Sequence, residues 1–198
     1  MSRKVVGLDI GTHSVKAVLV KETFRGIELD GYYEKPILEE GPEHLSSQIR
    51  SLFRDNHLRP DTVVTAVPGN RLSIHHLTLP FTDLRKVSQI LPFEIEPLIP
   101  FPVEEVIVDH FPTGRMNGNG PNGGQPVCTG IVRKEDLQQR LQILRGAAID
   151  AKIIDADSID LFYAFVHFFK EPLDTPVALI DIGASKTNLC IVSGGKPK

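Results

Sequence analysis

The sequence predicts an α/β fold, and the order and repetition of its segments support this class. Three strand-like segments within residues 4–33 precede a helix at 42–56 and a further strand at 61–67. Strands that alternate with helices in this way are typical of α/β architecture. The segment at 177–192 then repeats the plan of the opening hairpin, in which an apolar strand ends in Asp-Ile-Gly, turns through small residues and returns as an apolar strand.

Composition and charge exclude several classes of protein. Hydrophobic residues make up 41% of the 198 residues and charged residues 24%, which allows a packed core and argues against a disordered chain. A formal net charge of −3 leaves no basic surplus for binding nucleic acid. No apolar run approaches the roughly 18 residues of a membrane helix, and the N-terminus has no signal-peptide core. Cys128 and Cys190 are therefore expected to be reduced thiols in a cytoplasmic protein.

The first elements follow from apolar spacing and from turn residues. The strands at 4–10 and 15–21 are joined by four residues, which is short enough for a tight hairpin. A third strand is expected at 27–33, after an Arg-Gly turn signal. The helix at 42–56 starts with a proline, which suits a first turn. Its apolar face consists of Leu45, Ile49, Leu52 and Phe53.

The middle of the chain predicts a second group of strands with a helix. Residues 71–79 alternate in polarity as a strand does. A helix is expected to begin at a Thr82 cap and to kink or end at Pro92, which cannot continue helical hydrogen bonding. Further strands are expected on either side of a loop at 114–126 that contains five glycines.

The last third of the chain predicts two helices and the second hairpin. A helix at 134–148 leads to a short strand at 152–154. The next helix, at 157–170, has apolar residues on most of its faces and is therefore expected to be buried. Strands at 177–182 and 187–192 complete the second hairpin.

The glycine at the bend of each hairpin has a chemical consequence. Glycine has no Cβ, so successive backbone N–H groups can approach a phosphate and form an anion-binding concavity. Thr12, Ser14 and Ser185 add hydroxyl donors, and Lys16 adds a positive charge. The carboxylates of Asp9 and Asp181 repel phosphate but suit a hydrated Mg²⁺ ion. The alternative is that both segments are ordinary turns, in which Asp and Gly serve only the turn geometry.

Two kinds of motif carry a resemblance to known families. Asp-Ile-Gly-Thr at 9–12, followed by Lys16, resembles the first phosphate motif of the actin-like ATPases, and Asp-Ile-Gly-Ala-Ser at 181–185 resembles their second. The segment at 91–96, Leu-Pro-Phe-Glu-Ile-Glu, and the Ile-Pro-Phe-Pro stretch that begins at Ile99 are similar to a region of PilM and GspL. These are families of cytoplasmic components of type IV pilus and type II secretion platforms in the inner membrane.

The resemblance implies a fold and a division into subdomains. It implies an α/β fold in which a ribonuclease-H-like half of an actin-type ATPase carries an inserted α+β subdomain like that of FtsA and PilM. Residues 1–70 and 156–198 would form the actin-like part with both phosphate hairpins, and residues 71–155 would form the insert. The chain ends soon after the second motif, so we expect a fragment without the adenosine motif of a complete member.

The resemblance also implies ATP and Mg²⁺ as ligands between the hairpins. The expected nucleotide-binding residues all lie in the two motifs and are Asp9, Gly11, Thr12, Ser14, Lys16, Asp181, Gly183, Ala184 and Ser185. Asp9 and Asp181 are the expected Mg²⁺ ligands, through water. No residue for hydrolysis maps onto this chain from the family, so ATP binding with at most slow hydrolysis is expected.

Three acids near the helix at 157–170 are the candidates for positioning an attacking water, as a Gln or an acid does in hydrolysing relatives. They are Asp155, Asp157 and Asp160. The favoured alternative is that Asp157 or Ser158 caps this helix.

Partners and location follow from the resemblance alone. PilM-like proteins receive the N-terminal peptide of the membrane protein PilN, and GspL-like proteins contact the secretion ATPase. We therefore expect such partners, and other platform proteins, at the cytoplasmic face of the inner membrane, with membrane contact only through partners or a further C-terminal segment. An extended peptide could add to a sheet edge or lie between the main subdomain and the insert. The choice between PilM and GspL stays open, and the alternatives are a small-molecule kinase of the same superfamily and an FtsA-like cell-division protein.

Overall fold

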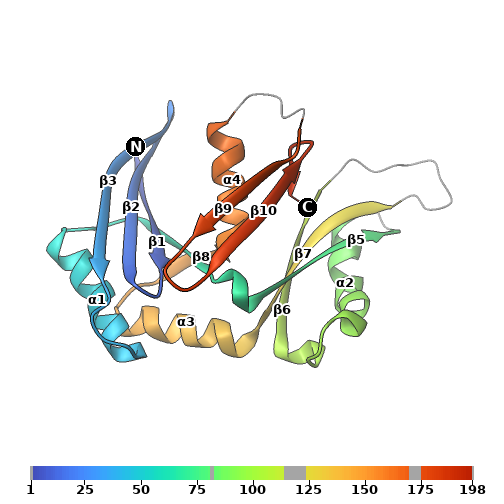
Figure 1. The fold of residues 1–198 in the computed structure, drawn as a ribbon, viewed down its shortest axis with the longest axis horizontal. Coiled ribbons are helices and arrows are strands. Elements are labelled where there is room, and N and C mark those ends of the chain that lie inside the picture. Colours follow the sequence, from blue (N-terminus) through green and yellow to red (C-terminus); the bar gives the residue numbers. More distant parts are fainter. Residues whose placement is uncertain (1, 81–82, 114–123, 170–174, 198) are drawn as a thin grey trace.

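Three β-sheets and four α-helices organise the described part of the chain, which comprises residues 2–80, 83–113, 124–169 and 175–197 of a computed structural model (Figure 1). A five-stranded sheet with two covering helices contains the N-terminus. A three-stranded sheet with one helix forms a second body, and the third sheet holds the C-terminal hairpin. The α/β class expected from the sequence is therefore confirmed.

The five-stranded sheet has the order β3-β2-β1-β4-β8. Its strands are β1 (Arg3–Ile10), β2 (Ser14–Thr23), β3 (Gly26–Pro36), β4 (Thr62–Val67) and β8 (Ala151–Ala156). The first three strands pair antiparallel as two successive hairpins, whereas β4 runs parallel to β1 and β8 runs parallel to β4. The carboxyl ends of β1, β4 and β8 consequently meet at one edge of the sheet.

Two helices, α1 (Pro42–Asp55) and α3 (Lys134–Gly146), pack on one face of this sheet. The apolar face predicted for α1 is confirmed, since Ile49 and Leu52 are fully buried against the sheet. The helices also contact each other directly, and the Ser46 hydroxyl donates to the Ile143 carbonyl at 2.9 Å. This core supports the strands whose ends carry the first hairpin motif.

The second body is an antiparallel sheet in the order β5-β7-β6. It contains β5 (Leu72–Leu79), β6 (Val106–Pro112) and β7 (Gln125–Arg133), with α2 (Leu84–Ile95) on one face. Short 3₁₀ turns at Gly69–Arg71, Glu96–Leu98 and Val103–Glu105 connect its elements. The core between the helix and the sheet is apolar and contains Leu79, Val87, Leu91, Ile95, Val106, Val127 and Ile131.

Helix α2 differs from its expected form at both ends. It does not end at Pro92 but continues to Ile95, whose side chain is completely buried in the core of the second body. Packing of this last turn outweighs the hydrogen bond that proline cannot make. The capping residue is Asp83, whose side chain accepts from the Arg85 N–H at 3.0 Å. The expected cap, Thr82, lies outside the described residues.

The pairing of β8 moves the boundary of the second body. Residues 71–155 are the insert expected from the sequence, but β8 pairs with β4 in the five-stranded sheet, and α3 packs against α1. The second sheet thus extends only from Leu72 to Arg133. Local patterns cannot show this boundary, because it depends on which strand β8 pairs with.

The third sheet joins the C-terminal hairpin to a helix. It contains β9 (Val177–Ile182), β10 (Thr187–Ser193) and β11 (Lys196–Pro197) in the order β11-β10-β9. Helix α4 (Asp157–Phe168) packs on it, with Phe162 buried against Cys190 and Val192. The second predicted hairpin is therefore confirmed, with antiparallel pairing of β9 and β10.

The expectation that α4 is buried on most faces is wrong. Ile159 and Phe162 are buried, but Tyr163, Val166 and Phe168 are 50%, 41% and 77% exposed. The described neighbours of α4 cover only some of its apolar side chains. One face packs on the third sheet and the end of β4 and β8, and the rest remains accessible.

Three other expectations concern membrane-spanning helices, the two cysteines and the glycine-rich loop. None of the described helices is long and apolar enough to cross a membrane. Cys128 and Cys190 are both free and buried. The glycine-rich loop expected at 114–126 lies mostly outside the described residues.

Shortening a buried side chain of α1 should destabilise the N-terminal core. Leu52 is 1% exposed, so Leu52→Ala removes methyl groups from a filled space and leaves a cavity. We expect a loss of about 2–5 kcal/mol in the free energy of unfolding, measured by urea denaturation. Leu38→Ala is the matched control, because Leu38 is 78% exposed, and it should change stability by less than about 0.5 kcal/mol. Equal effects of the two substitutions would contradict this packing.

Candidate functional site

The bends of the two predicted hairpins touch each other. Thr12 Oγ1 lies 2.9 Å from Ser185 Oγ, although the two residues are 173 positions apart in the chain. Both bends have the same internal hydrogen bond, since the Gly11 N–H donates to the Ser14 carbonyl at 3.1 Å and the Gly183 N–H donates to the Lys186 carbonyl at 2.9 Å. Figure 1 shows the β1–β2 and β9–β10 bends side by side. The repeated sequence motif thus corresponds to a repeated turn.

Both turns are tight around their glycines. A Cβ atom on Gly11 would lie 3.0 Å from the Ser14 carbonyl oxygen, and one on Gly183 would lie 3.0 Å from the Lys186 carbonyl oxygen. Both distances are tighter than most contacts of real Cβ atoms, and the neighbouring atoms belong to the backbone. A larger residue would therefore have to open the turn.

A single cleft of about 930 Å³ lies between the hairpins. Eight of the nine residues expected to bind nucleotide line it, and these are Asp9, Gly11, Thr12, Ser14, Lys16, Asp181, Gly183 and Ala184. The ninth, Ser185, contacts Thr12 at the bend. The structure thus brings all of them to one place, in a volume that is ordinary for a small-molecule site.

Several polar side chains of the first hairpin already have partners within the protein. Lys16 Nζ lies 3.7 Å from Asp9 Oδ2, and both side chains are partly exposed in the cleft. The Ser14 hydroxyl donates to Glu34 Oε1 at 2.6 Å, so it is committed to a neighbouring strand. Hydrogen bonds from Ser14 and Tyr32 hold the pKa of Glu34 below its ordinary value. Thr12 and Lys16 are therefore the side chains of this hairpin best placed to meet a ligand.

Asp157 joins helix α4 to the second hairpin. Its Oδ2 atom accepts from Lys186 Nζ at 2.7 Å and from Asn188 Nδ2 at 3.3 Å. Asn188 also donates to Asp181 Oδ2 at 3.1 Å. The expectation that Asp157 or Ser158 caps α4 is wrong, because Ala156 is the N-cap and no side chain caps the helix.

Gly69, in the turn that leads to the second body, packs closely against the side chains of Asp157 and Asn188. A Cβ atom on Gly69 would lie 2.8 Å from Asn188 Oδ1 and 2.9 Å from Asp157 Oδ1. Asp157 Oδ1 is buried and has no hydrogen-bond partner among the described residues. The turn at Gly69–Arg71 thus needs a residue without a side chain to approach the junction of α4 and β10.

Asp160 is the second acid that α4 contributes to the cleft. Burial raises its pKa to about 7, and the negative charges of Asp155 and Asp157 act in the same direction. Asp155 itself lines a different cavity, on the other side of the helix start. The three candidate acids are therefore divided between two cavities, with Asp157 and Asp160 in the hairpin cleft.

Sequence reasoning missed several residues of the cleft. Glu34, Gly69, Arg140, Lys186 and Asn188 lie at or beside it, and none belongs to the two motifs as first defined. Lys186 and Asn188 could have been found, because they follow the second motif closely, Lys186 at the end of the bend and Asn188 on β10. The others reach the cleft from distant segments, and no local signal marks them.

The cleft has carboxylates suited to a hydrated cation but no complete metal site. Asp9 and Asp181 both line it, on opposite hairpins. Within the described ranges, no three or more His, Cys, Asp and Glu side chains are grouped so that they could hold a metal ion. Mg²⁺ keeps several water ligands and combines one or two carboxylates with phosphate oxygens, so these residues fit an ion that arrives with a polyphosphate.

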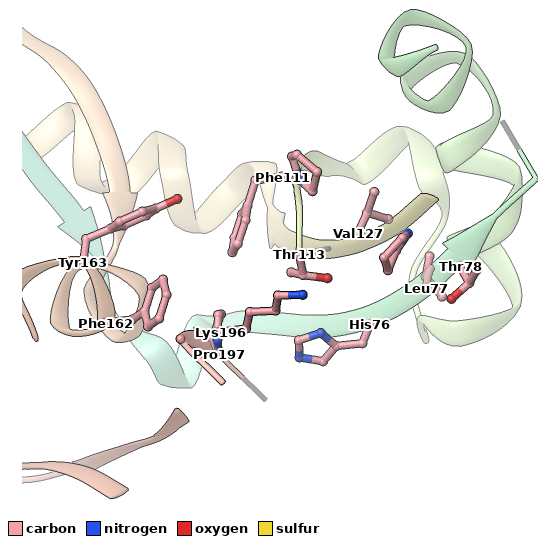
Figure 2. A pocket seen from close by; sticks show the side chains of 13 residues that line it. His76, Leu77, Thr78, Phe111, Thr113, Val127, Phe162, Tyr163, Lys196 and Pro197 are labelled. Carbon is pink, nitrogen blue, oxygen red and sulfur yellow. The ribbon is translucent and has the colours of Figure 1, made fainter. Parts of the chain in front are cut away.

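A separate groove of about 1220 Å³ runs between the second body and α4 (Figure 2). Figure 2 shows Phe162 and Tyr163 of α4 at one end and Leu77 and Val127 of the second sheet at the other. His76 and Lys196 lie alongside each other within it. A smaller cavity of about 380 Å³ shares Phe111 and Tyr163 with the groove. The second sheet and α4 therefore form two walls of an open, largely apolar groove.

Comparisons with known proteins identify similar sequences and folds. The model of the family described as type IV pilus assembly protein PilM matches residues 7–197. A chain of the PilM–PilN type IV pilus biogenesis complex is 27% identical with a TM-score of 0.82, and the match covers 98% of this chain and 59% of that chain. The present chain thus spans about three fifths of that protein.

Two more distant structures show the same fold. The cytoplasmic domain of EpsL, an inner membrane component of the type II secretion system of Vibrio cholerae, is 15% identical with a TM-score of 0.59, over 94% of this chain and 70% of that chain. A Bacteroides thetaiotaomicron protein with an actin-like ATPase fold is 10% identical with a TM-score of 0.50, over 98% and 67%. The expected resemblance to PilM and the expected actin-like fold are confirmed.

The raised pKa of Asp160 predicts a pH-dependent contribution to stability. The unfolded carboxyl titrates near 3.8 and the folded one near 7, so the folded protein binds more protons between these values. The stabilisation is therefore complete below pH 3.8 and is lost as the pH rises through about 7. Asp160→Asn is neutral at every pH, so its free energy of unfolding should rise relative to wild type between pH 5 and pH 8.

Urea denaturation at both pH values measures this difference. Asp150→Asn is the control, because the Asp150 side chain is 80% exposed. This variant should keep a constant offset from wild type over the same range. A constant offset for Asp160→Asn as well would show that Asp160 titrates alike in the folded and unfolded states.

Proposed function

Because the chain belongs to the type IV pilus assembly protein PilM family, we propose that it is an actin-like ATP-binding scaffold. It acts in the inner-membrane platform of a type IV pilus, on the cytoplasmic side, where it docks other platform proteins. The observation that carries the nucleotide part of the proposal is the meeting of two Asp-Ile-Gly bends over one cleft. The groove beside α4 supports the docking part.

The residues of the two bends fit a triphosphate and its metal ion. The Gly11 and Gly183 N–H groups are hydrogen-bonded within their turns, so the other backbone N–H groups of the two bends would bind the phosphates. Lys16 would contribute a point charge to a phosphate oxygen. Asp9 and Asp181 would hold Mg²⁺ through its water ligands, and the ion would neutralise phosphate charge beside these carboxylates.

Nucleotide in this cleft would serve as a structural ligand more than as a substrate. Of the three candidate acids for hydrolysis, Asp157 contacts the second hairpin directly, but its Oδ2 atom already accepts hydrogen bonds from Lys186 and Asn188. Burial raises the pKa of Asp160 to about 7, so about half of this carboxyl is protonated at neutral pH and that fraction cannot accept a proton from water. We therefore propose slow hydrolysis at most, so that the bound state persists long enough to support assembly.

The partner proposed for the groove is the cytoplasmic N-terminal peptide of a PilN-like membrane protein. One chain similar to this one was solved in a PilM–PilN complex. An extended peptide suits a groove with one wall formed by a sheet and the other by a helix, because apolar side chains can fill pockets along it. Phe111, Phe162 and Tyr163 offer the aromatic contacts that dominate such interfaces. Binding to such a peptide would place the protein at the membrane.

Removing charges from the first hairpin should weaken nucleotide binding. We expect Asp9→Ala and Lys16→Ala each to lower the affinity of the intact protein for Mg²⁺-ATP by about tenfold or more, measured by calorimetry. Asp9 would lose its contact with the hydrated ion, and Lys16 its contact with a phosphate.

Lys4→Ala is the matched control for Lys16→Ala. Lys4 is exposed near the opposite end of the same hairpin, and it does not line the cleft. It should leave ATP affinity unchanged. Wild-type affinity in both Asp9→Ala and Lys16→Ala would exclude the nucleotide role of this hairpin.

Removing an aromatic ring from the groove should weaken peptide binding. Tyr163 lines both the groove and the smaller cavity beside it, so Tyr163→Ala removes contacts from each. We expect the affinity for a synthetic N-terminal peptide of the PilN-like protein to fall by about tenfold, measured by fluorescence anisotropy. Phe168→Ala is the control, because Phe168 lies on the same helix, is 77% exposed and does not line the groove. A larger loss for Phe168→Ala than for Tyr163→Ala would place the peptide elsewhere.

A further inference from the structure

Arg140 is a buried cation at the hairpin cleft that belongs to neither motif. It lies on α3, and its side chain is only 8% exposed, which is rare for an arginine. The same side chain lines the cleft together with residues of both hairpins and of α4. Arg140 thus reaches the cleft from a helix that also contacts α1 and β7 and packs Leu144 into the core of the five-stranded sheet.

The charge of Arg140 is not matched by a direct partner. Across the residues that the structure describes, its guanidinium makes no hydrogen bond and no ion pair within 4.0 Å. Burial lowers its pKa, while the more distant carboxylates of Asp9 and Asp157 act in the opposite direction. None of its nitrogens is among the fully buried polar atoms of the described residues that have no partner, so its N–H donors are open to the cleft and free to bind an anion there.

The other two permanent cations of the cleft differ from Arg140 in this respect. Lys16 Nζ lies 3.7 Å from Asp9, and Lys186 Nζ lies 2.7 Å from Asp157. Each lysine therefore has a carboxylate of the same cleft as its partner. Among the described arginine and lysine residues that line the cleft, Arg140 alone is available to an incoming anion without first giving up an ion pair.

An anionic ligand in this cleft needs such a group. Carboxylates from five residues line it, and these are Asp9, Glu34, Asp157, Asp160 and Asp181. Two paired lysines do not offset them. The planar fork of a guanidinium matches two phosphate oxygens at once, and such charge-assisted bonds are strong where water is excluded.

We propose that Arg140 binds a phosphate group of the nucleotide from the α3 side of the cleft. This inference rests on the nucleotide role proposed above and names a residue that selects for polyphosphate. Triphosphate would contact Arg140, whereas the shorter phosphate chain of AMP would not need it. Arg140 thereby links phosphate binding to α3, and through α3 to α1, in the core of the five-stranded sheet.

The test compares ATP and AMP binding by the intact protein in Mg²⁺, using calorimetry. Arg140→Met keeps most of the length and apolar stem of the side chain but removes the guanidinium. We expect it to weaken ATP binding by about 10- to 100-fold and to leave AMP binding within about twofold. Arg140→Lys keeps the charge without the fork and should fall between wild type and Arg140→Met.

Arg145→Met is the matched control, because Arg145 lies on the same helix, is exposed and does not line the cleft. It should bind ATP as wild type does. Thermal unfolding of each variant by circular dichroism shows whether the fold is retained, and Arg140→Lys provides the measurement if Arg140→Met does not fold.

The outcomes separate this inference from the proposed function. If the wild-type protein binds ATP and both Arg140→Met and Arg140→Lys bind it equally well, the role of Arg140 is overturned. The nucleotide proposal would still stand. Equal losses for ATP and AMP would also overturn it, because Arg140 would then only balance Asp9 and Asp157. If the wild-type protein binds neither nucleotide, both proposals fail together.

Discussion

The cleft depends on the contact between the start of α4 and the second hairpin. Asp157 holds Lys186 and Asn188 at and beside the bend of that hairpin, and Asn188 in turn reaches Asp181. The Asp157 and Lys186 side chains are only 23% and 30% exposed, so their ion pair is less screened by water than a surface pair. Removing one partner would leave the other charge partly buried, which is the unfavourable part of breaking such a pair. The contact of Thr12 with Ser185 also joins the tips of the hairpins, but it is exposed. The contacts of Asp157 therefore fix the position of the second hairpin.

The two walls of the cleft have different support. The first hairpin belongs to a five-stranded sheet backed by α1 and α3, with Val6, Leu8 and Val15 almost fully buried beneath it. The second hairpin has a small sheet, and its apolar contacts to α4 centre on Cys190 and Val192. Local stability follows buried apolar contact, so the first wall is the more firmly held of the two. A ligand between them would meet one fixed surface and one that is carried largely by α4.

The parts that the sequence predicts are those fixed by local patterns. The bends at Gly11 and Gly183 need a small residue whatever surrounds them, and the apolar face of α1 follows from spacing alone. The roles of Asp157 and Arg140 could not be predicted in this way, because each depends on segments far away in the chain. An acid at the start of a helix often caps it. Here the Asp157 carboxylate instead accepts a hydrogen bond from Lys186, which lies 29 residues later in the chain. The pairing of β8 and the exposure of α4 could not be predicted from local patterns either, since both depend on which elements become neighbours.

Helix α4 stands between the two cavities that carry the proposed function. Asp157, Asp160, Leu161 and Ala164 line the hairpin cleft, while Phe162 and Tyr163 line the groove against the second body. A packed helix shifts as a unit, so a position of α4 that favours one occupant changes the shape offered to the other. If nucleotide and peptide prefer the same position, each raises the affinity of the other by the same factor, and if they prefer different positions, each lowers it. If both proposed sites are occupied, α4 is the element that both ligands would contact, and they need no contact with each other to be coupled.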